Sequence, residues 1–454
     1  MEKEVFFGNK MSISPKLSRF DLSMIVVSLV VGMGIFATPG QVAKYLHNPY
    51  LYFIAWVIGG IISFCGALTF AEIGSAYPAT GGFYKVFSHC FNPAIAFMVN
   101  WILVLSNAMS VAAIILIGAQ YILPVIMPIN LHNQTGIKII TITSVITLYL
   151  LNLLGIKASA NTQNILTCFK IGLILILCTA IGRSHSGFGL AIDPNPPIHV
   201  INSFGLSLVA IFFTYGGYQQ TINFGGDIIN AKSNLPKAIF TGLLIVITLY
   251  MLINIAYVSV LGMDGLQRRP ALAAALAGVI FGSTGFKLVS VLMFASVLAY
   301  VNVNFMANPR VYYAMAEDGV LPMQFKKLNK RTQVQEFGLT FFVAAILVVL
   351  FFIESFQNML SYVMFFDTIG LSIAALCIFI LRSKAANTDH LTNAYRIKGY
   401  PWIPLLFIVS YWSVTIIIFV EHPQAALICL LSFLIGFVIY FFTKRGQKPI
   451  LNNK

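Results

Sequence analysis

A glycine-rich segment interrupts the first apolar stretch of the chain, and its backbone could bind charged groups. Residues 31–36 read Val-Gly-Met-Gly-Ile-Phe and contain Gly32 and Gly34. Glycine lowers the cost of leaving the helical conformation and lets a ligand approach the backbone closely. A helix that restarts here would offer N–H groups at a positive dipole end, which suit a carboxylate, whereas carbonyls of the preceding helix suit a cation. The groups offered are the N–H groups of Met33, Gly34 and Ile35 and the carbonyl of Val30.

A second segment of the same kind occurs in the sixth apolar stretch. Residues 213–218 read Phe-Thr-Tyr-Gly-Gly-Tyr, with Gly216 and Gly217 adjacent. Carbonyls at Phe213, Thr214 and Gly216 would suit an ammonium group, so the two segments together describe a site for an α-amino acid. The alternative is that the glycines only let helices pack closely. The repetition five helices apart favours binding, because irregular backbone at membrane depth is tolerated where it lines a cavity.

Four charged residues within or at the ends of apolar segments are candidates for proton transfer, ligand binding or gating. Lys170 and Asp367 lie near the middle of apolar segments, where charge is costly and indicates function. Lys170 could instead extend to the membrane surface. Asp367 is interpreted as a proton carrier, as a counter-charge for a cationic ligand, or as a carboxylic acid hydrogen-bonded within the helices. Glu72 and Arg310 lie near segment ends on one side and form a candidate inner-gate ion pair, with a solvated Glu72 as the alternative.

The composition places these residues in an integral membrane protein. The 454 residues are 58% hydrophobic and 9% charged, with a mean hydropathy of +0.86, so the chain lacks the polar residues that a water-soluble surface needs. Apolar runs near the roughly 20 residues that cross a bilayer recur along the chain. We predict twelve spans: 20–45, 50–72, 94–123, 138–155, 163–182, 202–229, 236–261, 285–316, 337–353, 358–381, 402–420 and 424–442.

Basic residues predict the orientation of these spans. With twelve spans, 21 of the 28 lysines and arginines fall on the side of the two termini, six fall on the other side, and Lys170 lies within a span. Both termini are therefore expected in the cytoplasm. The net charge of +14 is divided among short loops, which favours contact with anionic lipid over nucleic acid. The six cysteines form no C-x-x-C pair, so neither a disulfide framework nor a metal site is expected.

The positions of the two glycine segments predict an internal repeat. Spans one to five (residues 20–182) and six to ten (residues 202–381) form equivalent blocks with odd numbers of helices, so the second block must be inverted relative to the first. Spans eleven and twelve (residues 402–442) are additions, flanked by cytoplasmic termini at residues 1–19 and 443–454. Residues 271–282 are expected to form a short external lid helix, and an amphipathic helix is expected near residue 84 at the cytoplasmic surface. The expected fold is all-α, a 5+5 inverted repeat plus two helices, with helices one and six unwound at mid-membrane.

Four ordered motifs over residues 20–440 resemble the amino acid-polyamine-organocation superfamily, in particular its L-type and related bacterial amino acid permeases. The first is the glycine segment of helix one, and the second contains Glu72 in helix two. The third combines the glycine segment of helix six with an acidic residue and N-L-P, and the fourth ends helix eight. The matching residues are Gly32 to Phe36 with Pro39; Ala71 to Gly74 with Pro78, Gly81, Gly82 and Tyr84; Phe213 to Tyr218 with Asp227 and Asn234 to Pro236; and Arg310 with Tyr313 to Ala316, Asp318, Gly319, Leu321 and Pro322.

This resemblance implies roles for several residues. Phe213 resembles the aromatic gate over the bound substrate, and Lys170 resembles the lysine that replaces a sodium ion in sodium-independent relatives. Met33 is a departure, because relatives carry serine or alanine between the two glycines of helix one. Its N–H group can still bind a carboxylate, but a hydroxyl contact is lost and a long side chain is added. The backbone expected to hold the amino acid is that of Val30, Met33, Gly34, Phe213, Thr214 and Gly216.

The sequence thus predicts a secondary transporter rather than an enzyme, with no cofactor and no ATP-binding loop. The expected substrate is a neutral amino acid, moved by alternating access through proton symport or exchange in a cell membrane. A cationic amino acid or polyamine is the alternative substrate, and a membrane amino acid sensor is the alternative of another class. A channel is disfavoured because no ring of charge or carbonyl filter motif appears. The oligomeric state is not indicated.

Overall fold

The described part of the protein is a bundle of helices. The computed structural model describes residues 17–76, 82–154, 160–183, 200–225, 228–269, 271–329, 331–332, 334–352, 356–385 and 395–445. An isolated parallel bridge joins Leu17 to Ile228. The α-helices are α1 (Arg19–Val30), α2 (Gly34–Tyr45), α3 (Pro49–Ala76), α4 (Gly82–Cys90), α5 (Pro93–Ile126), α6 (Gln134–Leu153), α7 (Ala160–Cys178), α8 (Val200–Tyr215), α9 (Ala231–Arg268), α10 (Leu272–Glu317), α11 (Glu336–Phe352), α12 (Phe356–Ala385), α13 (Trp402–Glu421) and α14 (Pro423–Arg445).

Each of the twelve predicted spans overlaps one helix or a consecutive pair. Among the described residues, nine helices are individually long and apolar enough to cross a membrane, and α1 with α2 passes the same test as a bent pair. The apolar helices α7 and α11 are shorter, so the count of twelve stays a prediction. Large apolar side chains such as Phe351 and Trp402 are more than three-quarters exposed, as lipid-facing residues are.

The first predicted span is broken where its glycines lie. Ser18 caps α1 through a reciprocal capping box, in which its hydroxyl accepts from the N–H of Asp21 and its own N–H donates to the Asp21 carboxylate. The helix ends at Val30, α2 starts at Gly34, and the two axes differ by 41°. Residues 31–33 therefore form the first helix break.

Two further glycines bend the long helices α9 and α10. Gly262 and Gly282 have φ angles of 67° and 68°, a conformation that favours glycine. Gly262 interrupts α9 where the predicted span 236–261 ends. Gly282 interrupts α10 just before the predicted span 285–316 begins. Residues 272–281 thus form a separate helical piece before Gly282, which we call the lid helix, as expected for residues 271–282. Helix α4 likewise occupies the place of the predicted amphipathic helix.

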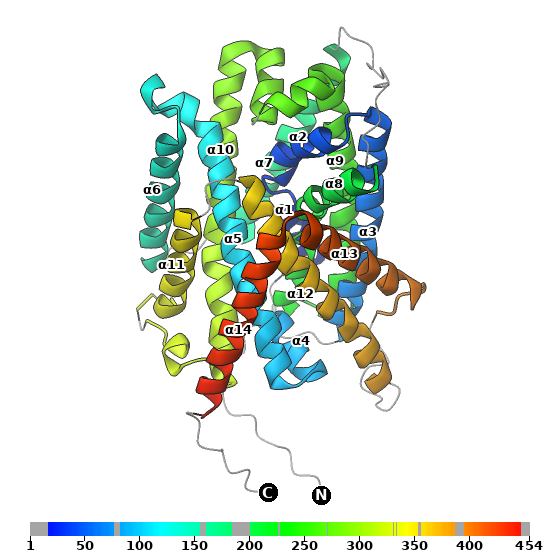
Figure 1. The fold of residues 1–454 in the computed structure, drawn as a ribbon, viewed down its shortest axis with the longest axis vertical. Helices are drawn as coiled ribbons and strands as arrows, with labels where there is room; N and C mark the ends of the chain where they lie inside the picture. The colour runs from blue at the N-terminus through cyan, green and yellow to red at the C-terminus, as the bar shows by residue number, and fades with distance from the viewer. Residues whose placement is uncertain are drawn as a thin grey trace, which may run out of the picture.

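The helices pack as two groups. Helices α1, α2, α3, α8 and α9 pack against one another and form the α1 group, whereas α5, α6, α10 and α11 form the α5 group. Figure 1 shows the α5 group on the left and the α1 group on the right. The α1 group contains the first two spans of each predicted block, and the α5 group contains the third and fourth. Helix α12 contacts both groups, because it packs on α5, α3 and α8.

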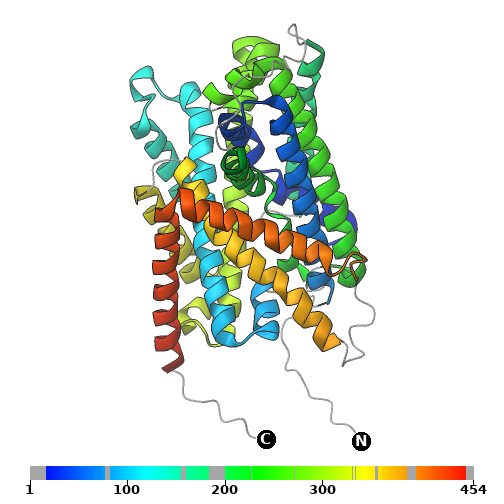
Figure 2. The same ribbon diagram turned by 45° about the vertical axis from the view of Figure 1, so that its right-hand side comes forward.

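The last two helices lie outside the two groups. Helix α13 packs on α12, α3 and α8, while α14 runs beside α5 and α12, so together they cover one side of the bundle (Figure 2). Several predicted features fall outside the described residues: most of both termini, Pro78 and Gly81 of the helix-two motif, and Asp227 of the helix-six motif.

Candidate functional site

A cavity lies between the two helix groups, at the level of both glycine segments. One wall comes from the first helix break and from the end of α8, including Gly32, Met33, Gly34 and Gly216. The opposite wall comes from α5, α10 and α12 and includes Asp367. The structure therefore brings together the two segments that the sequence singled out, although about 180 residues separate them.

The first helix break is pressed against α8. A Cβ atom on Gly34 would lie 3.0 Å from Thr214 Cα, so glycine allows the two segments to approach more closely than a larger residue would. The hydroxyls of Thr38 and Thr214 are 2.6 Å apart and join α2 to α8. Among the described residues, no acceptor is assigned to the N–H groups of Gly34 and Ile35, which start α2. These groups remain available for an anion, as the sequence predicts. Gly34 therefore combines close packing with a backbone N–H group that starts α2.

The carbonyls at the end of α1 already have partners. The Tyr250 hydroxyl donates to the Val30 carbonyl at 2.8 Å, and the N–H of Gly32 donates to the same oxygen at 2.7 Å. A carbonyl oxygen has two lone pairs, so this oxygen has no further acceptor capacity here. The predicted contact between the Val30 carbonyl and an ammonium group therefore does not fit this conformation. The next carbonyl, of Val31, accepts from Lys170 Nζ at 3.3 Å.

The second helix break follows α8, which ends at Tyr215, and precedes a 3₁₀ turn, η3 (Tyr218–Asn223). Gly217 has a φ angle of 115°, and a Cβ atom on it would lie 2.4 Å from the Leu29 carbonyl oxygen. Glycine is thus required both by conformation and by close approach to α1. The single hydroxyl proton of Tyr250 is shared between the Val30 carbonyl and the more distant Thr214 carbonyl, at 3.2 Å, so one buried hydroxyl contacts both breaks.

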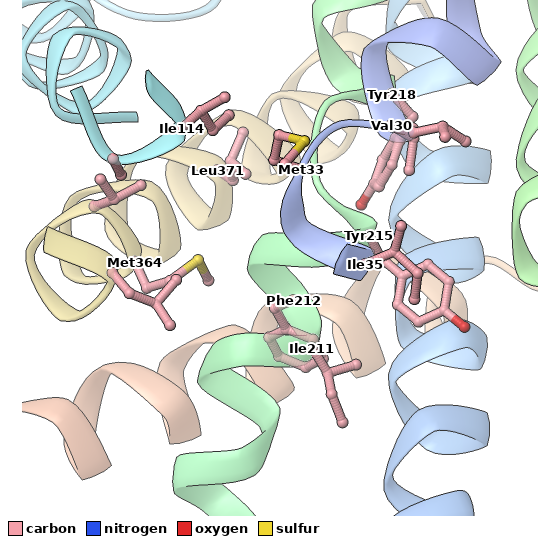
Figure 3. Close-up of a cluster of buried hydrophobic side chains, with 14 of the residues drawn as sticks. Val30, Met33, Ile35, Ile114, Ile211, Phe212, Tyr215, Tyr218, Met364 and Leu371 are labelled. Atoms are coloured by element: carbon pink, nitrogen blue, oxygen red, sulfur yellow. The ribbon is translucent and has the colours of Figure 1, made fainter. Parts of the chain in front are cut away.

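One aromatic and two aliphatic side chains at the breaks differ in exposure and direction. Phe213 is half-buried on the cavity wall, and its ring meets that of Phe356 edge-on with centroids 6.0 Å apart. Met33 is 2% exposed and, in Figure 3, extends toward Leu371, whereas Ile35 turns away toward Tyr215. Ile35 is therefore not part of the cavity lining, unlike Met33 and Gly34.

Lys170 and Asp367 have different positions relative to the cavity. Lys170, on α7, is buried behind the first break and contacts it through Val31. It does not extend to a surface, so the snorkelling alternative is wrong. Asp367, on α12, lines the cavity and accepts a 2.5 Å hydrogen bond from the Ser106 hydroxyl. This contact fits the interpretation of a carboxyl group bonded within the helices and leaves its access to the cavity intact.

A chain of side-chain amides on the cavity wall was missed by the sequence analysis. Gln220 donates to Asn107 at 3.4 Å and Asn107 donates to Asn308 at 3.0 Å. Asn308 in turn donates to the backbone carbonyl of Asn304, behind the cavity wall, at 3.0 Å. These hydrogen bonds connect η3, which follows α8, to α5 and α10. The four-residue spacing of Tyr300, Asn304 and Asn308 in an apolar segment was the available signal, because polar residues on one face of a membrane helix line a polar interior.

The predicted pairing of Glu72 with Arg310 is wrong in this structure. Glu72 is 4% exposed and accepts from Arg382 Nε at 2.6 Å and Nη2 at 2.8 Å. The N–H of Ile397 donates to the same carboxylate at 2.7 Å. The physical reason is packing: the end of α3 lies against α12, whereas Arg310 is exposed on α10 in the other group. Glu72 is also not a solvated helix end.

Removing the Glu72 charge should destabilise the protein markedly. Glu72→Gln keeps the side-chain shape but leaves Arg382 without its anion, and breaking a buried pair in this way costs about 3 kcal/mol. We expect a lower midpoint of thermal unfolding in detergent. Asp318→Asn is the matched control, because the Lys85–Asp318 pair at 2.6 Å is partly exposed and should contribute below about 1 kcal/mol. Equal midpoints for the two variants would contradict this assignment.

The Lys85–Asp318 pair joins α4 to the end of α10. Next to it, Tyr84 is buried and lines the cavity, and burial together with the Asp318 charge raises the pKa of its phenol. Asp318 belongs to the helix-eight motif and Tyr84 to the helix-two motif. The structure thus brings parts of two motifs together, with Tyr84 lining the cavity.

Comparisons with known proteins show which family the sequence matches. The model of the family described as "Amino acid permease" matches residues 17–448. The chain is 28% identical to the serine/threonine exchanger SteT of Bacillus subtilis, over 93% of this chain and 95% of that protein. It is 24% identical to the large neutral amino acids transporter small subunit 2 of Homo sapiens, over 96% of this chain and 81% of that protein. It is 26% identical to the vacuolar cationic amino acid transporter 4 of Arabidopsis thaliana, over 82% of this chain and 64% of that protein.

Proposed function

The chain belongs to the amino acid permease family, and from this premise we propose that it is a sodium-independent secondary transporter of neutral amino acids. The observation that carries the proposal is the meeting of two broken helices on one wall of a cavity that lies between two helix groups. Such a cavity can open to either side when one group rocks against the other. Coupling to protons and exchange of one amino acid for another are both compatible with this cycle.

The amino acid is held mainly by backbone. Its carboxylate binds the N–H groups at Met33, Gly34 and Ile35, where the α2 dipole favours an anion. Its ammonium group binds carbonyls of the second break, at Phe213 and Gly216. Support for this assignment comes from the Val30 carbonyl, whose acceptor capacity is already used by Tyr250 and Gly32. The Phe213 ring acts as the gate over the bound molecule.

Lys170 acts in place of a sodium ion. Its ammonium group donates to the Val31 carbonyl from a buried position behind the first break, which supports this role. A metal ion would hold such carbonyls by its positive charge, and a lysine supplies the same charge without a metal. Transport should therefore proceed in sodium-free buffer.

The protein acts in the plasma membrane with both termini in the cytoplasm. Support comes from the excess of basic residues on the terminal side of the predicted spans. The same residues contact anionic lipid.

Counterflow in proteoliposomes tests the proposal. Full-length protein is reconstituted in sodium-free buffer with unlabelled amino acid inside and a trace of labelled amino acid outside. We expect transient accumulation of label, which protein-free liposomes should not show. Binding of amino acids in a thermal-shift assay without any accumulation would instead identify a membrane sensor.

A cationic amino acid or polyamine is the second candidate substrate, because Asp367 supplies a carboxylate to the cavity wall. Among the described residues, the Asp367 carboxylate has the Ser106 hydroxyl as its hydrogen-bond donor and forms no ion pair. The similarity to a cationic amino acid transporter also favours this candidate.

Asp367→Asn distinguishes the two substrate classes. For a neutral substrate, we expect counterflow to stay within about threefold of the wild type, since an amide can still accept from Ser106. Loss of all uptake, together with wild-type preference for labelled arginine or putrescine over labelled alanine, would favour the cationic alternative.

A further inference from the structure

Met33 stands at the point where a bound amino acid would begin to extend its side chain. It is the residue before Gly34 and lines the cavity. Its neighbours in the N–H cluster of α2 bind the carboxylate in the function proposed above, on which this inference rests. A carboxylate held there would place the substrate Cα next to Met33. The side chain at this position therefore borders the room available to the substrate.

The Met33 side chain extends across the cavity rather than away from it. Figure 3 shows it reaching from the first helix break toward Leu371 of α12, with Ile114 of α5 beyond. Met33 and Met364 are each 2% exposed, and Ile114 and Leu371 are each 4% exposed, although all four line the cavity. Their surfaces are thus covered by other protein atoms, so this apolar end of the cavity is filled.

Contacts with α8 hold the backbone of the first helix break, which carries the Met33 side chain, in place. Gly34 already lies against Thr214, where even a Cβ atom would approach Cα to 3.0 Å. The Thr38 and Thr214 hydroxyls tie the following turn of α2 to α8. The lining side chains that keep some exposed surface lie elsewhere on the wall, and they include Asn107, Gln220 and Asp367 as well as Leu103 and Phe213.

We propose that Met33 sets the upper size of the substrate side chain, so that the site takes small amino acids such as alanine and serine and rejects large ones such as leucine and phenylalanine. The filled apolar end, bounded by Met33, Leu371 and Ile114, has no room for a branched or aromatic side chain. A thioether also offers no hydrogen-bond donor, so Met33 selects substrates through the space that its side chain occupies. Met33 is a specificity-determining residue on this basis.

The test is the ratio of leucine to serine counterflow in proteoliposomes that contain the full-length protein. The wild type should favour serine. Met33→Ala removes the atoms beyond Cβ and should raise the leucine-to-serine ratio by about tenfold or more, the scale on which apolar pockets discriminate by size. Met33→Leu conserves volume and should keep the wild-type ratio within about threefold.

Two further variants keep the result interpretable. Met359→Ala removes the same atoms from a methionine of α12 that is 0% exposed and does not line the cavity, so its ratio should not change. Leu371→Ala opens the same space from the opposite wall and should shift the ratio as Met33→Ala does, which covers the case in which Met33→Ala does not fold.

Different failures have different meanings. A wild type that exchanges leucine as fast as serine, or an unchanged ratio in Met33→Ala and Leu371→Ala with exchange retained, overturns the size limit and leaves the proposed function standing. Absence of counterflow for every amino acid tested in the wild type overturns the proposed function, and the size limit with it.

Discussion

Replacing Lys170 with methionine is expected to reduce transport by about tenfold to one-hundredfold. Methionine keeps the apolar length of the side chain but removes the ammonium group that donates to the Val31 carbonyl. A buried carbonyl left without its partner costs about 1–3 kcal/mol, and each 1.4 kcal/mol changes an equilibrium about tenfold. The first helix break would then leave its binding geometry in most molecules.

The measurement is initial counterflow of labelled amino acid at several pH values, with the amount of folded protein fixed by gel filtration. Lys44→Met is the control, because Lys44 is exposed near the end of α2 and should be dispensable. If Lys170→Met kept both the rate and its pH dependence, Lys170 would not act as the sodium replacement. A lost rate that added sodium restored would support that role further.

Replacing Gly217 with alanine is expected to abolish amino acid binding. The residue has a φ angle of 115°, which costs a non-glycine residue about 1–3 kcal/mol. The added Cβ would also lie 2.4 Å from the Leu29 carbonyl oxygen, so α1 and the second break would have to separate. Both contacts of Tyr250 depend on that approach, because its hydroxyl reaches carbonyls on both breaks.

The measurement is the thermal shift that a saturating amino acid produces in purified protein. The Gly217→Ala variant should show no shift while it still elutes as a folded species. Gly172→Ala is the matched control, since an added Cβ on this α7 glycine meets nothing within 4 Å. A wild-type shift in Gly217→Ala would mean that the second break does not form part of the amino acid site.

The glycines illustrate how far sequence reasoning extends here. Sequence patterns led to two breaks and to their pairing, because two glycine clusters in apolar stretches have few explanations in a bilayer. They did not separate the roles of the individual glycines. Gly34 and Gly217 are required by the approach of another helix, whereas Gly32 has only an atom of Val30 near its Cβ position.

The charged residues show the opposite case. Glu72 and Arg310 were paired because both lie near helix ends on one predicted side. Which ends meet depends on how helices far apart in the chain pack, and α3 packs on α12, so Arg382 is the partner. Tyr250 was missed for the same reason, since nothing near it in sequence indicates that its hydroxyl reaches the carbonyls of Val30 and Thr214.

The sequence by itself determined the membrane class, the helical segments and the positions of the two breaks. These follow from local physics: a bilayer requires apolar length and internally satisfied backbone groups, and glycine marks where that requirement is relaxed. Only the tertiary structure decided which carbonyls already have partners, which arginine pairs with Glu72, and that Met33 fills one end of the cavity. Those facts depend on contacts between helices hundreds of residues apart, which packing sets and local sequence does not encode.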